Sequence, residues 1–316
     1  MKVSIIINTF NNESTIDKCL TNVVDQSYPD FECIIIDDNS SDKTGVIIEK
    51  YRNKDNRLTF LTNETNLGCS LTRRKGFEHS KGEYVVFIDG DDWMELDYLD
   101  MMIKKASMEN ADLVYCDYYE EDGKTVKYMP QDIDKKTRNQ IIAAMASYDP
   151  LLVSSLWNKL IRCDLLQKVE FPEERYGEDM YISLQLAFYS NNSAYVAAPL
   201  YHYWKNNSGS LCNNVTNERE RRLAMFDICR KILYFIDTHY INKVMLEPFF
   251  SIRMNKTSLR IFEDPVLKYE RNPFVLYPSA IKFLFRKGVN FSIWLKVKYL
   301  LCTIRYNFFR GMRLVL

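Results

Sequence analysis

Short apolar runs alternate with amphipathic helical segments along residues 3–116, and this alternation constrains the fold more than any other feature. The predicted strands are 3–7, 33–36, 58–61, 84–88 and 112–116. The predicted helices are 14–26, 46–51, 71–79 and 99–107. Strands that alternate with helices at this spacing form a mainly parallel sheet with helices on both faces. We therefore predict an α/β fold for this part of the chain.

Polar clusters follow three of these strands. They are Asn8–Asn11, Asp37–Asn39 and Asp89–Asp92. In open α/β sheets, ligands bind beyond the carboxyl ends of the strands. The three clusters are therefore expected to line one crevice.

The cluster after the fourth strand carries the strongest chemical signal. Asp89 and Asp91 flank Gly90, and two carboxylates with a glycine between them suit Mg²⁺ or Mn²⁺ bound together with a phosphate. Asp92 is expected to belong to the turn and to the helix that follows. The alternative is an acidic turn that leaves all three carboxylates in water.

Other residues of the crevice suit a nucleotide. Asp38 can accept the imide N–H of a uracil, and Phe10 can lie against the base. Arg73, at the start of a helix, can reach a diphosphate as a forked donor. Each residue also has an ordinary reading: a turn aspartate, a core phenylalanine and a surface arginine.

Length and composition narrow the class of protein. A chain of 316 residues can bury a full core without disulfides. Its eight cysteines form no CxxC pairs, which indicates reduced thiols and a cytoplasmic protein, and its three histidines are too few and scattered for a histidine metal site. The apolar run at the N-terminus stops at Asn8, so it is expected to be a first strand and not a signal peptide.

The C-terminal part differs from residues 3–116 in its hydrophobic pattern and its charge. After a predicted helix at 137–147 and a polar stretch at 205–217, the sequence favours helices at 217–239 and 249–262. Residues 271–316 contain no Asp or Glu and are basic and aromatic. Two interpretations remain open: an interfacial helix on an anionic membrane, or a helical subdomain packed on the rest. No nucleic-acid motif accompanies the charge.

Seven ordered motifs carry a family resemblance. SIIINTFNNE, ECIIIDDNSSDKT, NLGCSLTRRKGF and GEYVVFIDGDDW resemble the nucleotide-binding half of family 2 glycosyltransferases, the inverting enzymes of the GT-A fold. SLWNKLIRCDLL, FPEERYGEDMYISLQLAF and PLYHYWKNNSGS resemble the acceptor side of bacterial members that assemble surface polysaccharides. The resemblance covers residues 1–212.

The resemblance implies an architecture. It is a GT-A (Rossmann-like) three-layer α/β/α sandwich around a mainly parallel mixed sheet, followed by a helical C-terminal region. Residues 1–117 would form the nucleotide-binding half, and 118–212 the acceptor and catalytic half. Residues 213–316 would be a helical extension with the basic tail.

The resemblance also implies site residues. The nucleotide-sugar site would comprise Thr9, Phe10, Asn11, Glu13, Asp38, Asn66, Arg73 and Asp89. Asp91, with Asp89, would hold the Mg²⁺ or Mn²⁺. Two positions depart from the family pattern: Asn8 replaces a proline, expected to matter only for the backbone, and Arg74 replaces an asparagine and could alter how the pyrophosphate is held.

Glu178 and Asp179 open a predicted helix and supply the candidate chemistry. A carboxylate in a first helical turn is stabilised in its charged form, so Asp179 is expected to be a base without a strongly raised pKa. By resemblance, Asp179 takes the proton of an acceptor hydroxyl in a single displacement, with Glu178 in support. His202 stays unassigned, and Trp157–Lys159 either contact the acceptor or belong to the core.

The implied function is transfer of a hexosyl or N-acetylhexosaminyl group from a nucleotide sugar, expected to be UDP-linked. The acceptor would be a saccharide, expected to be carried on a polyprenyl lipid at the inner face of the cell membrane, in capsule, exopolysaccharide or O-antigen synthesis. The donor sugar, the acceptor and the linkage cannot be read from the motifs.

Three rival functions make different demands on the sequence. A phosphatase of the haloacid dehalogenase type, or another phosphoryl-transfer enzyme, would use Asp89 and Asp91, but its motif should end the first strand. A nucleotidyltransferase needs a glycine-rich loop after the first strand, which NTFNNE lacks. A GT-A domain kept as a binding scaffold would dispense with Asp91 and Asp179.

Overall fold

The computed structural model describes residues 1–131, 133, 136–147, 154–205, 218–239 and 241. Two compact units make up the chain, Met1–Glu218 and Arg219–Leu316. Helix α8 (Glu218–Thr238) is the element described in the second unit, and it matches the helix predicted at 217–239. The helix predicted at 249–262, the basic tail and the proposed boundary at 212 lie outside the described residues. No described helix is both long and apolar enough to cross a membrane.

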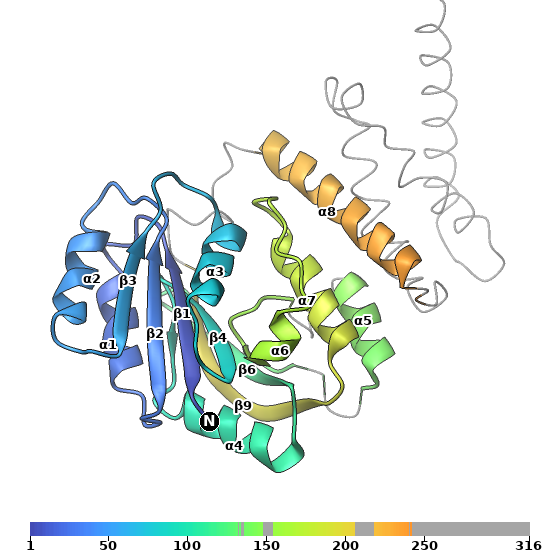
Figure 1. Ribbon diagram of the computed structural model, residues 1–316, viewed down its shortest axis with the longest axis horizontal. Helices are drawn as coiled ribbons and strands as arrows, with labels where there is room; N and C mark the ends of the chain where they lie inside the picture. The colour runs from blue at the N-terminus through green and yellow to red at the C-terminus, as the bar shows by residue number, and fades with distance from the viewer. Residues whose placement is uncertain (132, 134–135, 148–153, 206–217, 240, 242–316) are drawn as a thin grey trace, which may run out of the picture. The chain divides into compact units, whose positions relative to one another are not determined.

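One mixed sheet of nine strands organises the first unit (Figure 1). The strand order is β3-β2-β1-β4-β8-β6-β9-β5, and β7 pairs with β6. The strands are β1 (Val3–Thr9), β2 (Phe31–Asp37), β3 (Leu58–Thr62), β4 (Tyr84–Asp89), β5 (Trp93–Met94), β6 (Leu113–Glu121), β7 (Val126–Met129), β8 (Lys159–Arg162) and β9 (Ser193–Trp204).

The seven helices described in the first unit flank this sheet (Figure 1). They are α1 (Ile16–Val24), α2 (Thr44–Arg52), α3 (Cys69–Glu78), α4 (Tyr98–Glu109), α5 (Arg138–Ser147), α6 (Cys163–Leu166) and α7 (Glu178–Tyr189). The apolar stripes of α1 and α4 join one core cluster with alternate residues of β1, including Ile5 and Ile7. Helix α3 covers the other face, where a Cβ at Gly76 would overlap Ile6. The predicted three-layer α/β/α architecture is confirmed.

Strands β3, β2, β1 and β4 pair in parallel. Every residue of β1 is buried, and so is every residue but one in β2 and in β4. The second half of the sheet is more mixed. Strand β8 lies antiparallel between β4 and β6, β9 runs parallel to β6 across a bulge near Asp117, and β5 pairs antiparallel with β9. The sheet is mixed, as predicted, and its parallel order is concentrated in the first half.

Candidate active site

The carboxyl ends of β1, β2 and β4 meet at one edge of the sheet. Thr9 is in register with Asp37, and Asn8 with Asp89. Because β1 lies between β2 and β4, the end of β1 contacts the chain that follows each of them: the Asp38 N–H bonds the Thr9 carbonyl and the Gly90 N–H bonds the Asn8 carbonyl. The sequence-predicted polar clusters are therefore neighbours in space.

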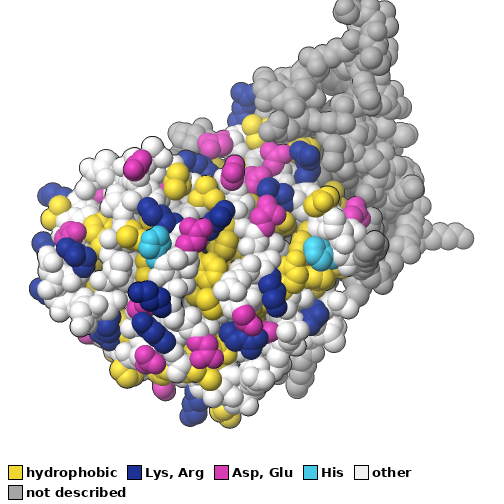
Figure 2. Space-filling view, in the orientation of Figure 1, with side chains coloured by type: hydrophobic (Ala, Val, Ile, Leu, Met, Phe, Trp, Pro, Cys, Tyr) yellow, Lys and Arg dark blue, Asp and Glu magenta, His cyan; other side chains and the backbone are white. Residues whose placement is uncertain are grey.

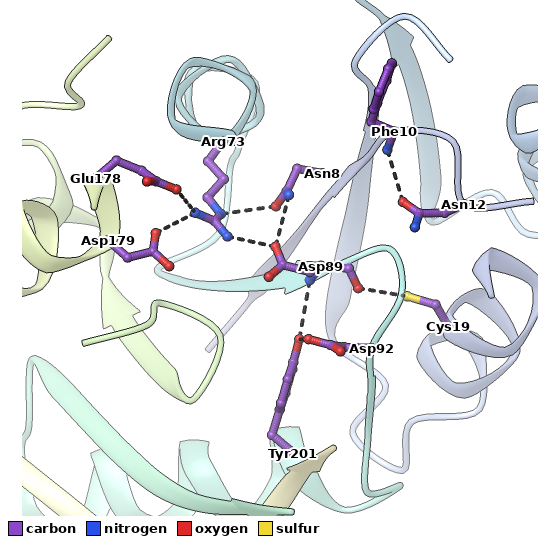
Figure 3. Close-up of polar contacts among 10 residues, drawn as sticks. All are labelled: Asn8, Phe10, Asn12, Cys19, Arg73, Asp89, Asp92, Glu178, Asp179 and Tyr201. Atoms are coloured by element: carbon purple, nitrogen blue, oxygen red, sulfur yellow. Dashed lines mark hydrogen bonds and ion pairs between the residues drawn. The ribbon is translucent and has the colours of Figure 1, made fainter. Parts of the chain in front are cut away.

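Arg73 lies at the centre of this edge and links it to the start of α7 (Figure 3). Its side chain is 3% exposed. Nη2 donates to Asp89 Oδ1 at 2.7 Å, and Nη1 donates to Asp179 Oδ1 at 2.6 Å and lies 3.7 Å from Glu178 Oε1. Burial alone would lower the pKa of Arg73, but the charges of Asp179 and Asp89 raise it well above its ordinary value. One guanidinium thus joins the candidate nucleotide site to the candidate base.

Asn8 completes this network through its side chain. Its Nδ2 donates to Asp89 Oδ1 at 3.0 Å, and its Oδ1 accepts from Arg73 Nε at 3.1 Å. The expectation that Asn8 matters only for the backbone is wrong, because an amide that both donates and accepts ties two charged side chains together. Arg74, the other departure from the family pattern, forms an exposed ion pair with Glu78 at 2.9 Å.

The turn after β4 separates its three aspartates. Gly90 is required by space, because a Cβ there would lie 2.6 Å from Thr9 Oγ1. Asp92 is 1% exposed; its Oδ2 accepts from Tyr201 Oη at 2.7 Å and its Oδ1 from the Trp204 backbone N–H at 2.8 Å. Burial, followed by repulsion from Asp91 and Asp89, raises the pKa of Asp92 well above its ordinary value.

Asp92 belongs to the turn, as expected, because its N–H bonds the Asp89 carbonyl, but the expected link of its side chain to the following helix is wrong. Its carboxyl group anchors the turn to β9, a strand about 110 positions later in the chain. Asp91 and Asp89 remain as the partly exposed carboxylates of the turn.

The metal expected at Asp91 and Asp89 can be tested against these contacts. Asp89 Oδ1 accepts from Arg73 and Asn8, whereas no donor from the described residues reaches Oδ2. No group of three or more His, Cys, Asp or Glu side chains in the described part gathers as a metal cage. Mg²⁺ commonly takes one or two carboxylates and completes its shell with water and substrate phosphates. Two partly exposed carboxylates therefore fit such a cation.

Asp38 shapes the loop beyond β3. Its carboxylate accepts from Asn63 Nδ2 and from the backbone N–H groups of Leu67 and Gly68, each at 2.8 Å. Asn66 Nδ2 donates to the Asp38 carbonyl at 3.3 Å. Asp38 and Asn66, both predicted to meet the donor, thus lie side by side in the chain that follows β2 and β3.

The other predicted nucleotide residues join the loops after β1 and β2. Thr9 Oγ1 donates to Asn12 Oδ1 at 2.8 Å. Asn11 Oδ1 accepts from the Ser41 N–H at 2.9 Å, and Glu13 Oε2 from the Lys43 N–H at 3.0 Å. Phe10 is 45% exposed and presents its ring beside these loops. Thr9, Asn11 and Glu13 therefore hold the loops together, while Phe10 is available for stacking.

Glu178 and Asp179 begin α7 after Gly177, whose φ of 81° is left-handed and favours glycine. Burial, followed by repulsion from Asp179, raises the pKa of Glu178 to about 8. Burial also raises the pKa of Asp179, although Arg73 opposes this. The first-turn argument excluded only a strongly raised pKa for Asp179, and Arg73 opposes the rise there; at Glu178 desolvation dominates.

Lys159 is a buried titratable residue. From the sequence it was expected either to contact the acceptor or to belong to the core. It is 0% exposed; its Nζ donates to Asn158 Oδ1 at 2.8 Å and to the Ser155 carbonyl. Burial lowers its pKa to about 7, and the charge of Asp179 opposes this shift. Trp157 stacks on Tyr201 at 4.5 Å in the core. The signal for Lys159 in the sequence was a charged residue close to Trp157 and directly before the apolar pair Leu160 and Ile161.

His202 lies between two carboxylates. Its Nε2 is 2.8 Å from Glu95 Oε1, its Nδ1 is 2.5 Å from Glu121 Oε1, and its ring stacks on Trp93 at 5.3 Å. These contacts join β5, β6 and β9. The histidine is thus held between Glu95, directly after β5, and Glu121 of β6.

Comparisons with known proteins agree with this geometry. The model of the family described as Glycosyl transferase family 2 matches residues 4–170. EpsH of Bacillus subtilis is 35% identical over 210 residues, which are 64% of this chain and 60% of EpsH. Glycosyltransferase GlyA of Streptococcus pneumoniae is 28% identical over 211 residues, 64% of this chain and 30% of GlyA. The chain thus spans less than two thirds of each of these relatives.

A solved structure supports the fold. The crystal structure of Staphylococcus aureus TarS 1–349 in complex with UDP-GlcNAc superposes with a TM-score of 0.63 and 22% identity, over 92% of this chain and 93% of that one.

Proposed function

Since the chain belongs to glycosyl transferase family 2, we propose that it moves a sugar from a nucleotide sugar to a hydroxyl group of a saccharide acceptor, with inversion. The donated group would be a hexosyl or N-acetylhexosaminyl group. Relatives named as glycosyltransferases support transferase activity, and the UDP-GlcNAc bound to TarS supports a UDP-linked donor.

One observation carries this proposal: Arg73 bonds both Asp89, at the end of β4, and Asp179, at the start of α7. A transferase needs its catalytic base close enough to the donor site for the acceptor hydroxyl to contact both the base and the donor. The shared guanidinium brings these two groups to one crevice, although 90 residues separate them in sequence.

The proposed mechanism is a single displacement. The acceptor oxygen attacks the anomeric carbon as the bond from that carbon to the diphosphate oxygen breaks, and the diphosphate keeps the bonding electrons. Asp179 takes the hydroxyl proton. Arg73 keeps Asp179 ionised and oriented, and Glu178, largely protonated near neutral pH, adds no second charge beside it.

At the donor end, Asp38 would accept the uracil imide N–H and Phe10 would cover the base. Thr9, Asn11 and Glu13 would fix the loops around the nucleotide, with Asn66 beside the donor and Asp89 near the ribose. When bound at Asp91 and Asp89, Mg²⁺ or Mn²⁺ would offset charge on the departing diphosphate. Arg73 already donates to three of the chain's own side chains, which leaves two of its five N–H groups for a diphosphate.

The proposed function extends to the acceptor and to the location of the protein in the cell. We propose a polyprenyl-linked saccharide of a bacterial surface polysaccharide, used at the inner face of the cell membrane. The basic tail at 271–316 would supply attraction to anionic lipid, and no described helix spans a membrane.

A screen of nucleotide sugars tests the proposal. The purified chain is incubated with UDP-glucose, UDP-galactose and their N-acetyl forms, with Mg²⁺, Mn²⁺ or EDTA, and release of UDP is measured. We expect release with one donor, a loss of at least about 100-fold in Asp179→Asn and Asp91→Asn, and normal release in Asp164→Asn, whose carboxylate pairs with Arg162 at the surface.

The rival functions give different results. A phosphoryl-transfer enzyme would release inorganic phosphate and form a beryllofluoride adduct on Asp89. A binding scaffold would bind donor and release nothing. Undiminished transfer by Asp179→Asn would reject the proposed base.

A further inference from the structure

The crevice is rich in negative charge, yet its proposed donor is an anion. Asp89, Glu178 and Asp179 surround the buried guanidinium of Arg73, and Asp91 lies two residues after Asp89. A nucleoside diphosphate would bring further negative charge to this point. A second cation beside the diphosphate would offset it.

Arg175 supplies a guanidinium with free donor capacity. It lies in the segment that leads to α7, and it reaches across 109 positions of sequence to the loop after β3. Its Nη1 donates to Asn66 Oδ1 at 2.9 Å and its Nη2 to the Asn66 carbonyl at 2.7 Å. Both acceptors are neutral, and no carboxylate of the described residues lies within ion-pair distance. Two of its five N–H groups are used here.

The position of Arg175 fits the middle of the donor. Asn66 also bonds Asp38, which marks the proposed uracil end. Arg175 is four residues before Asp179, which marks the proposed reaction end. The diphosphate of a nucleotide sugar lies between its base and its anomeric carbon, so it would lie between these two ends.

Gly68 lies directly against the side chain of Arg175 and leaves room for it. Gly68 has φ 85°, and a Cβ there would lie 3.2 Å from Arg175 Cγ. A residue with a side chain would be strained at this φ, and the arginine stem would have to shift by a few tenths of an ångström. The Gly68 N–H meanwhile bonds Asp38 Oδ2, so one glycine serves both the loop and the arginine.

On the proposed function, we infer that Arg175 is a donor-binding residue that contacts the diphosphate, and that its bonds to Asn66 hold it ready across the crevice. Arg73, which the motif pattern suggested for this contact, instead holds Asp89 and Asp179. The segment before α7 thereby joins nucleotide recognition to the helix that carries the base.

Binding of uridine, UMP and UDP to the full chain tests this inference. Affinities are measured by calorimetry for the wild type, Arg175→Ala and Arg175→Lys, with and without Mg²⁺. We expect Arg175→Ala to weaken UDP about 10- to 100-fold and uridine less than about 2-fold, because the contact is with phosphate. Lysine keeps the charge without the fork, so we expect partial recovery.

The matched control is Arg57→Ala, which removes an arginine paired with Asp55 at the opposite, amino-terminal end of β3. It should bind all three ligands normally, and thermal melting should show each variant folded. Equal affinity of Arg175→Ala and wild type for UDP, or equal loss for uridine and UDP, overturns the inference while the proposed function stands. A wild type that binds no nucleoside diphosphate overturns both.

Discussion

Glu178 and Asp179 are adjacent acids in different surroundings. Arg73 lies 2.6 Å from Asp179 and 3.7 Å from Glu178, so the guanidinium favours the aspartate as the ionised member. Glu178→Gln imitates the protonated glutamate, and we expect it to keep transferase activity within about 5-fold at pH 7. Asp179→Asn removes the base, and we expect a loss of about 10² to 10⁴ in kcat. Steady-state rates of UDP release measure both.

The same pair predicts a dependence of stability on pH. The pKa of Glu178 is about 8 in the folded chain and near 4.5 when unfolded, so the unfolded state loses this proton first. The contribution of Glu178 to stability therefore falls as pH rises from 4.5 to 8. In urea unfolding over pH 5.5–8.5, Glu178→Gln should lack this decline. A parallel decline in the variant would assign it to another group.

Lys159 predicts the opposite dependence of stability on pH. Its pKa is about 7 when folded against 10.5 when unfolded, so above pH 7 the unfolded state binds the extra proton. Stability therefore rises with pH between 7 and 10.5, by up to about 1.4 kcal/mol per pH unit. We expect the stability of Lys159→Met to lack this rise when urea unfolding is followed from pH 7 to 9.5.

The control for Lys159 is Lys168→Met, which removes an exposed lysine a few residues further along the chain. It should keep the wild-type slope. The Lys159 prediction would be contradicted if Lys159→Met and wild type changed in parallel, because the buried amine would then keep its ordinary proton affinity.

The turn between β4 and β5 depends on close contact with β1. A Cβ at Gly90 would lie 2.6 Å from Thr9 Oγ1, whereas at Gly45, in α2, its nearest neighbour would be 3.6 Å away. We expect Gly90→Ala to cost about 1–3 kcal/mol and to weaken UDP binding, since Asp89 and Asp91 flank the glycine. Gly45→Ala should be neutral or stabilise by up to about 1 kcal/mol. Urea unfolding and calorimetry compare the two, and equal effects would reject the steric argument.

Elements with a local signal were predictable from sequence. Strands β1 to β4 are apolar runs that are followed by segments with helical periodicity, and polar clusters follow β1, β2 and β4, so the order of these strands and the shared sheet edge could be expected. Strand β8 could not be predicted, because it is only four residues long and its pairing with β4 and β6 is decided by tertiary packing. Strand β9 likewise depends on a long, bulged pairing with β6.

The site divides in the same way. Asp38, Asp89 and Asp91 follow strands and were placed correctly at the sheet edge, although their roles remain predictions. The bonds of Arg73 to Asp179 and of Asp92 to Tyr201 join residues more than 100 positions apart, and no short-range pattern encodes them. Asn8 and Arg175 were missed for this reason.

At the scale of the whole chain, charge is distributed unevenly. There are 42 basic and 42 acidic residues, and the last 46 residues hold nine basic and no acidic ones, so residues 1–270 carry nine net negative charges. An anionic membrane would repel the larger part and attract the tail within about a Debye length. Any membrane attachment of this protein should therefore depend on the tail and on salt.

Vesicle binding tests the tail in the full chain. We expect binding to vesicles with anionic lipid, little binding to zwitterionic ones, and release as salt is raised to about 0.5 M. Replacing Lys296, Lys298 and Arg305 by Gln should weaken the free energy of membrane binding by roughly 1 kcal/mol for each residue. Together the three changes should lower partitioning onto the vesicles about 100-fold. The control replaces the exposed Lys50, Lys54 and Lys104 by Gln, which changes the net charge equally but leaves the tail intact. If both triple variants bind like wild type, the tail serves only as a packing element, because charge attraction requires the two variants to differ.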